Sequence, residues 1–217
     1  MCFKKLGKII KSVIFVKKLN MASVSLRSNR VIGLEKKKKY ISKEEYRTRY
    51  SDREDGFKYE WNNGIIERTE SMKKYQALIE AAILRLFFNT EAFRNHGMIC
   101  AEMETDTSDT QLRKPDLAYY TANQLNVMDD DISQTPSWVC EVISKTDDME
   151  DVQKKIVEYF VAGVQCVWIV LPKNEMVYVY TSVSEVTICQ GETVCSGAPA
   201  MLDFHIEARR LFEKINV

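Results

Sequence analysis

Two acidic residues stand inside apolar segments of the chain, and they are the first candidates for chemistry. Asp116 lies in Lys114-Pro115-Asp116-Leu117-Ala118, and Glu141 lies in Val139-Cys140-Glu141-Val142-Ile143-Ser144. A carboxylate on a buried strand is costly unless it is paired or bound to a metal. Two such acids on neighbouring strands indicate a shared cation, and oxygen ligands without His or Cys favour Mg²⁺ or Mn²⁺. The alternative is that either acid faces solvent or pairs with an arginine.

A lysine on the following helix is the third candidate. The segment 149–162 has apolar residues at helical spacing, and Gly163 predicts its end. Lys154 projects opposite the apolar face, whereas Lys155 lies at its edge, from which it can reach the end of the Glu141 strand. We therefore expect Lys155 to be the functional lysine. The alternative is that Lys155 is exposed and paired with Asp151.

The remaining elements must position these three side chains. The strand 138–144, the helix 149–162 and the strand 165–171 predict a crossover between two parallel strands, and we infer an α/β sandwich with a mixed sheet. The other predicted elements are a helix at 42–49, a hairpin of 57–61 and 65–68, a largely buried helix at 72–88, strands near 98–105 and 114–121, a polar loop at 123–135, a hairpin of 176–181 and 185–190, and a short strand or turn and then a helix at 205–214.

Charge is distributed very unevenly along the 217 residues. The chain has 31 basic and 31 acidic residues, yet residues 1–50 hold 15 of the basic and only 3 of the acidic ones. We read residues 1–40 as a flexible basic arm and 41–217 as a single domain. A basic arm on an acidic body suggests an anionic partner, although a solvated tail is an equal alternative. Residues 1–20 are either a basic amphipathic segment or lie upstream of a true start at Met21.

The cysteine and histidine pattern argues against zinc and for a reducing compartment. Six cysteines occur without any CxxC pair, and only two histidines are present. No stretch is long and apolar enough for a membrane-spanning helix. We therefore expect a cytoplasmic protein.

The order of these motifs resembles the PD-(D/E)xK nuclease superfamily. In its common form the lysine lies two residues after the glutamate, but Ile143 holds that place here. A lysine supplied by the helix is the arrangement of the Uma ("Uma-two") family of putative restriction endonucleases. The segment 55–60 followed by Gly64 is similar to that family's opening hairpin. The core motif matches at Glu141 and Ser144, at Asp151, Lys155 and Tyr159, and at Gly163, Val164, Trp168 and Pro172.

This resemblance implies a fold and a set of roles. The fold would be a restriction-endonuclease-like core, with a mixed central β-sheet flanked by helices, an N-terminal β-hairpin and a C-terminal hairpin. Asp116 and Glu141 would bind the metal together with the Val142 carbonyl. Lys155 would orient or activate the attacking water and stabilise charge on the phosphate, and Glu60 would be an accessory acid. Two departures concern the helix start, where Tyr75 replaces the usual His, and the turn Asn62-Asn63-Gly64, where Asp is usual before Gly.

The function that follows is a metal-dependent endonuclease that hydrolyses phosphodiester bonds, with DNA as the expected partner. A divalent ion and a lysine suit this reaction, because it needs a nucleophile at neutral pH and neutralisation of charge on the phosphate. The alternative is a non-catalytic protein of the same fold that binds nucleic acid or a protein partner. A homodimer is left open, because restriction-type enzymes often pair to cut both strands.

Overall fold

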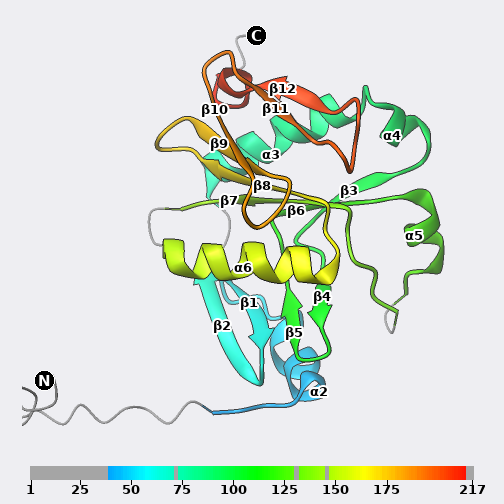
Figure 1. Ribbon diagram of the computed structural model, residues 1–217. Coiled ribbons are helices and arrows are strands. Elements are labelled where there is room, and N and C mark those ends of the chain that lie inside the picture. The colour runs from blue at the N-terminus through cyan, green and yellow to red at the C-terminus, as the bar shows by residue number, and fades with distance from the viewer. Residues whose placement is uncertain (1–38, 71–72, 130–131, 145–146, 214–217) are drawn as a thin grey trace, which may run out of the picture. The chain divides into compact units, whose positions relative to one another are not determined.

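The computed structural model describes residues 39–70, 73–129, 132–144 and 147–213 (Figure 1). The predicted basic arm, apart from its last two residues, and the alternative start at Met21 lie outside the described residues. Within the described part, no helix is long and apolar enough to cross a membrane.

A six-stranded mixed sheet forms the centre of the fold (Figure 1). Only β7 and β8 are parallel, and the helix α6 connects them, which confirms the predicted crossover and the mixed sheet. All other neighbours in this sheet are antiparallel. Its order is β10 (Val186–Gln190), β9 (Met176–Tyr180), β8 (Cys166–Leu171), β7 (Trp138–Val142), β6 (Leu117–Tyr120) and β3 (Met98–Ala101).

Helices cover both faces of this sheet. The helix α6 (Met149–Ala162) packs on one face through Val152, Ile156 and Tyr159. On the other face lie α3 (Lys74–Phe87) and the 3₁₀ helix η2 (Ala208–Leu211), around a core that includes Trp138 and Trp168. Side chains alternate along β7, so that Val139 and Glu141 face α6 while Cys140 and Val142 face α3.

A second, four-stranded sheet carries the N-terminal hairpin. Its order is β2 (Ile65–Glu70), β1 (Phe57–Asn62), β5 (Gln111–Arg113) and β4 (Thr105–Ser108). The β1–β2 hairpin was predicted, and Asn63 and Gly64 in its turn have φ of 48° and 80°. These positive values are those that tight hairpin turns require. The short helices α2 (Lys43–Tyr46) and η1 (Arg47–Ser51) precede this sheet.

Two predicted strands are wrong in their extent. The segment predicted as 98–105 ends as β3 at Ala101, and β4 begins at Thr105 in the other sheet. The segment predicted as 114–121 follows the end of β5 at Arg113 and consists of a link at Lys114–Asp116 and then β6. Pro115 has no N–H to donate to a ladder, so the chain leaves one sheet and enters the other at this point. Asp116 is consequently placed where the two sheets meet.

Other elements differ from the prediction because their structure depends on tertiary contacts, which sequence patterns do not show. The helix α3 is not largely buried, because it lies on one face of the sheet and leaves the Leu78 side chain 64% exposed. The predicted loop at 123–135 begins with α5 (Ala122–Val127), capped by Thr121 and Gln124. The further elements are α4 (Glu91–Arg94), β11 (Val194–Ser196) and β12 (His205–Glu207), the last two paired with each other.

Candidate active site

The four residues singled out from sequence come from four different elements. Asp116 lies in the link between the sheets, Glu141 near the end of β7, Lys155 on α6 and Glu60 on β1. Asp116, Glu141 and Lys155 line one pocket of about 210 Å³. Glu60 is almost fully buried and contacts Lys155. The fold therefore brings all four together, although 95 residues separate Glu60 from Lys155 along the chain.

Both carboxylate oxygens of Asp116 are engaged by the protein. Oδ1 accepts a hydrogen bond from Lys58 Nζ at 2.8 Å, and Oδ2 accepts one from the backbone N–H of Val142 at 2.7 Å. The side chains of Lys58 and Asp116 are only 9% and 14% exposed. Asp116 is thus tied both to β1 and to the end of β7, and its position relative to Glu141 is fixed.

Glu141 lies beneath α6. Its Oε1 accepts a hydrogen bond from the Tyr159 hydroxyl at 2.6 Å and lies 3.7 Å from Lys155 Nζ. Burial raises the pKa of Glu141, the Lys155 charge opposes that rise, and the nearby Asp116 carboxylate adds to it. The net pKa is raised, as expected for a site in which two carboxylates repel one another and a further positive charge would be stabilising.

Lys155 is held as an ammonium group between two acids. Its Nζ lies 2.9 Å from Glu60 Oε2 and 3.1 Å from Glu60 Oε1. Burial alone would lower the pKa of Lys155, but Glu141 and Glu60 raise it above its usual value. A protonated lysine donates hydrogen bonds and cannot accept a proton. As an ammonium group, Lys155 can orient an oxygen and stabilise negative charge.

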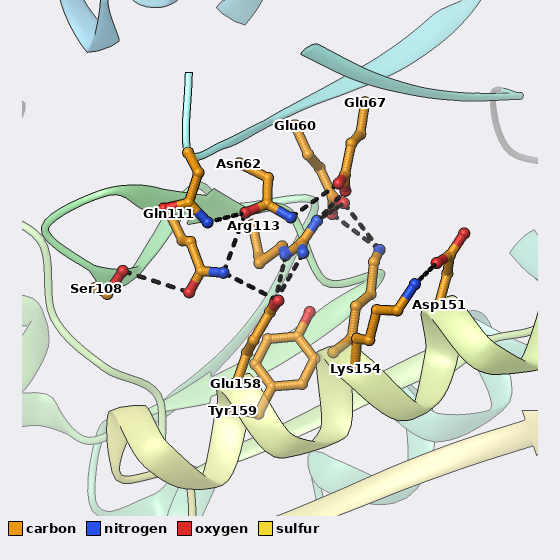
Figure 2. Close-up of polar contacts among 12 residues, drawn as sticks. Glu60, Asn62, Glu67, Ser108, Gln111, Arg113, Asp151, Lys154, Glu158 and Tyr159 are labelled. Carbon is orange, nitrogen blue, oxygen red and sulfur yellow. Dashed lines mark hydrogen bonds and ion pairs between the residues drawn. The ribbon is translucent and has the colours of Figure 1, made fainter. Parts of the chain in front are cut away.

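The neighbouring Lys154 points elsewhere. Its side chain is 65% exposed and pairs with Asp151 at 2.6 Å, on the outer surface of α6 (Figure 2). The pairing with Asp151 that the alternative reading gave to Lys155 is thus made by Lys154. The helix itself begins at Asp148, whose side chain accepts a hydrogen bond from the Glu150 N–H, and it ends at Gly163 with φ of 104°.

Arg113 is the centre of a buried ion cluster that joins α6 to the small sheet. Figure 2 shows its guanidinium between Glu60 and Glu67 on one side and Glu158 on the other. It lies 3.1 Å from Glu60 Oε2 and 2.7 Å from Glu158 Oε2, and it also contacts Glu67. Glu158 belongs to α6, so this cluster fixes the helix that carries Lys155 and Tyr159.

The Glu60 carboxylate holds two cations of the site, Arg113 and Lys155, in place. Its oxygens accept from Arg113, from Lys155 and from the backbone N–H of Lys114 at 3.0 Å. Burial would raise the pKa of Glu60, but the charges of Lys155, Arg113 and Lys58 lower it to about 2. Glu60 therefore stays ionised and holds Lys155 in place.

Two positions discussed from the sequence lie at the rim of the site. The Val142 carbonyl accepts a hydrogen bond from Gln76 Nε2 at 2.9 Å, which links the start of α3 to β7. Tyr75, at the place of the family's usual His, lines a neighbouring pocket of about 410 Å³. That pocket shares Ile143, Ser144 and Asp147 with the pocket that holds Asp116 and Glu141.

One buried acid near the site lacks a partner. Glu80 on α3 is 5% exposed, and its Oε1 has no hydrogen-bond partner among the described residues. Burial, followed by the charges of Asp116 and Glu102, raises the pKa of Glu80 to about 7. Its side chain is therefore largely protonated in mildly acidic solution.

Sequence reasoning missed Lys58, Arg113 and the contact of Tyr159 with Glu141. Lys58 lies two residues before Glu60 on β1, and strand periodicity places both side chains on one face. That spacing could have identified Lys58. Arg113 carried no such signal, because its three acidic partners come from β1, β2 and α6.

The donor set suits a hard divalent cation. Among the residues that the structure describes, no three His, Cys, Asp or Glu side chains are grouped as metal ligands. Mg²⁺, however, is commonly held by only one or two carboxylates together with waters and substrate phosphates. Asp116 and Glu141 share a small pocket whose described lining contains no His or Cys, and they match that requirement.

Comparison with known proteins places the chain in a family. Residues 43–209 match the family model Uma2, described as putative restriction endonuclease, and the chain belongs to this family. No protein of curated function matches it.

A solved structure has the same fold. It is the crystal structure of a putative nuclease belonging to DUF820 from Anabaena variabilis ATCC 29413, with a TM-score of 0.63 and 16% sequence identity. The match covers 71% of this chain and 89% of that chain. The nuclease fold predicted from the motifs is thereby confirmed.

The Arg113 cluster generates a prediction about stability. Arg113→Met would leave Glu60 buried without one of its cations, and breaking a buried ion pair costs about 3–5 kcal/mol. We expect urea denaturation to show a loss of that order in the free energy of unfolding. Arg209→Met is the control, because Arg209 pairs with Glu192 and Glu207 at the surface, and its loss should cost less than about 1 kcal/mol. Equal losses would contradict the role given to Arg113.

Glu80 generates a prediction about pH. Its pKa rises from 4.5 in the unfolded chain to about 7 in the folded one, so the folded state loses stability as pH rises through this interval. Glu80→Gln should therefore stabilise the protein at pH 8 by on the order of 2–3 kcal/mol and far less at pH 5. Urea denaturation in EDTA at both pH values measures this. A gain that is the same at pH 5 and pH 8 would show that ionisation of Glu80 is not its cause.

Proposed function

We propose that this Uma2-family protein is a metal-dependent endonuclease that hydrolyses phosphodiester bonds in DNA. Membership of a putative restriction endonuclease family and the nuclease fold support hydrolysis of nucleic acid in general terms. The observation that carries the specific proposal is the meeting of Asp116, Glu141 and the Lys155 ammonium at one pocket. Hydrolysis of a phosphodiester needs positive charge at the phosphate, because negative charge develops there in the transition state. Lys155 would supply one such charge, and a cation held by Asp116 and Glu141 would supply the other.

Each residue then has a separate task. Asp116 and Glu141 would hold Mg²⁺ or Mn²⁺, and a bound divalent ion lowers the pKa of water and neutralises phosphate charge. Lys155 would donate hydrogen bonds to a phosphate oxygen or to the attacking oxygen. Glu60 would keep that ammonium in position, since its distance to Nζ is 2.9 Å. Tyr159 would orient the Glu141 carboxylate through its hydroxyl.

The charge distribution indicates how DNA would be held. From residue 51 onward the chain has 28 acidic and 16 basic residues, a balance that does not favour contact with phosphates. Cations at the site reverse the sign locally. The basic residues of the N-terminal arm supply the second source of attraction. Binding should consequently weaken steeply as salt concentration rises.

One observation favours the alternative of a non-catalytic protein that binds nucleic acid or a protein partner. Each of the two acids already has a cation of the protein beside it, namely Lys58 at Asp116 and Lys155 at Glu141. If these pairs were permanent, the pocket would be a stable ion cluster without need of a metal. Metal-dependent cleavage distinguishes the two functions.

The proposed activity predicts metal-dependent nicking of plasmid DNA. Purified protein with Mg²⁺ or Mn²⁺ should nick or linearise supercoiled plasmid, and EDTA should stop the reaction. Asp116→Asn, Glu141→Gln and Lys155→Met should each lower the rate at least about 100-fold, which is the scale of losing one transition-state contact. Gel analysis of plasmid forms over time measures the rates.

Lys154→Met is the matched control, since Lys154 lies one residue away and faces solvent. It should cleave like the unmodified protein. Equal losses in the Lys154 and Lys155 variants would refute the assignment of Lys155. The absence of cleavage of plasmid, single-stranded DNA and RNA, together with no metal binding in calorimetry, would favour the non-catalytic alternative.

A further inference from the structure

Lys58 is a cation of the site to which the proposed reaction gives no task. It lies on β1, two residues from Glu60, and it lines the same pocket as Asp116, Glu141 and Lys155. Its Nζ contacts Asp116 Oδ1 at 2.8 Å. Lys58 therefore neutralises one of the two acids that are expected to hold the metal.

Three carboxylates of the site are paired with cations of the protein, and Glu102, Asp147, Asp148 and Asp151 also line the pocket. Three carboxylates, those of Glu60, Asp116 and Glu141, face the ammonium groups of Lys58 and Lys155 and one side of the Arg113 guanidinium. Arg113 and Lys155 are each shared between acids on different elements, whereas Lys58 forms an ion pair with only Asp116 among the residues that the structure describes. Of these three cations, Lys58 therefore loses the fewest ion pairs if it leaves its acidic partner, Asp116.

A divalent cation on Asp116 would lie next to the Lys58 ammonium. Like charges a few ångströms apart repel strongly where water is largely excluded, and both side chains are mostly buried here. Lysine has a flexible four-carbon stem and a compact charge, so its ammonium can move while its strand stays fixed. The open volume into which it can move is the pocket that Lys58 already lines.

We propose that Lys58 is an exchangeable counter-ion, which leaves Asp116 when the divalent cation binds and then contacts a substrate phosphate in the pocket. The inference rests on the proposed metal site at Asp116 and Glu141. Its consequence is a coupling between two ligands. Metal binding releases a phosphate-binding ammonium, and by linkage phosphate must favour metal binding.

A purely structural ion pair leads to different expectations. Loss of Lys58 would then destabilise the fold and leave the affinities for metal and for DNA unchanged in a variant that still folds. Lys114 offers a comparison within the chain, because its Nζ is held by Glu104 at 3.2 Å and by the Ser51 carbonyl at 2.8 Å and does not line the pocket.

The first experiment is titration of Mn²⁺ into DNA-free protein by calorimetry. Lys58→Met should bind Mn²⁺ at least about tenfold more tightly than the unmodified chain, within the usual range of coupling between two sites. Lys154→Met, which lies outside the site, should bind Mn²⁺ as the unmodified chain does. Lys58→Gln serves as the second variant if the methionine variant does not fold, and it should also bind Mn²⁺ more tightly.

The second experiment is fluorescence anisotropy with a labelled DNA duplex, with and without saturating Ca²⁺ in place of the catalytic metal. Without metal, Lys58→Met should change DNA affinity little, because Lys58 is held by Asp116. With Ca²⁺ it should lower DNA affinity about tenfold relative to the unmodified chain. A thermal melt of each variant checks that it is folded.

The outcomes separate the two proposals. Mn²⁺ binding that is equal in the unmodified chain and in folded Lys58 variants overturns the exchange, while the metal site stands. A loss of DNA affinity that is the same with and without Ca²⁺ also overturns it, since Lys58 would then contact phosphate without release. No Mn²⁺ binding by any variant removes the metal site and the exchange together.

Discussion

The buried ion cluster around Arg113 and Glu60 is the interaction on which the site depends. The four-stranded sheet and the helix α6 meet there, and ionic contacts join them. Arg113 binds acids on β1, β2 and α6, while Glu60 binds cations on β5 and α6. Charges this deeply buried must be paired, because an unpaired one is very costly. The requirement for pairing therefore fixes α6 over the end of β7 and places Lys155 beside Glu141.

The link at Lys114–Asp116 completes this arrangement. The chain passes from the small sheet to the central sheet there, and Arg113 and Asp116 stand at its two ends. Arg113 thus belongs to the ion cluster, and Asp116 belongs to the pocket. A short connection with Pro115 inside it leaves little freedom between them. The Pro115–Asp116 pair is in this way a structural junction as well as a source of a carboxylate.

Much of the fold and part of the site could be predicted from the sequence. The apolar run 165–171 and the amphipathic helix 149–162 predicted the parallel pair, because periodicity reports which faces are buried. The break between β3 and β4 could not be predicted, since both segments favour extended structure and only their different partner strands separate them. The site, too, could be predicted only in part. Asp116 and Glu141 were recognisable as acids within apolar runs, whereas the partners of Arg113 are distant in the chain and appear only in three dimensions.

We propose that Asp116 and Glu141 together hold a divalent cation. The most direct measurement is anomalous X-ray scattering from crystals of the protein soaked in Mn²⁺, beside crystals of Glu141→Gln treated in the same way. The account predicts an anomalous peak within bonding distance of carboxylate oxygens of both Asp116 and Glu141, and its loss in the variant. A structure in which Lys58 stays on Asp116, with no peak in the pocket at saturating Mn²⁺, would contradict it.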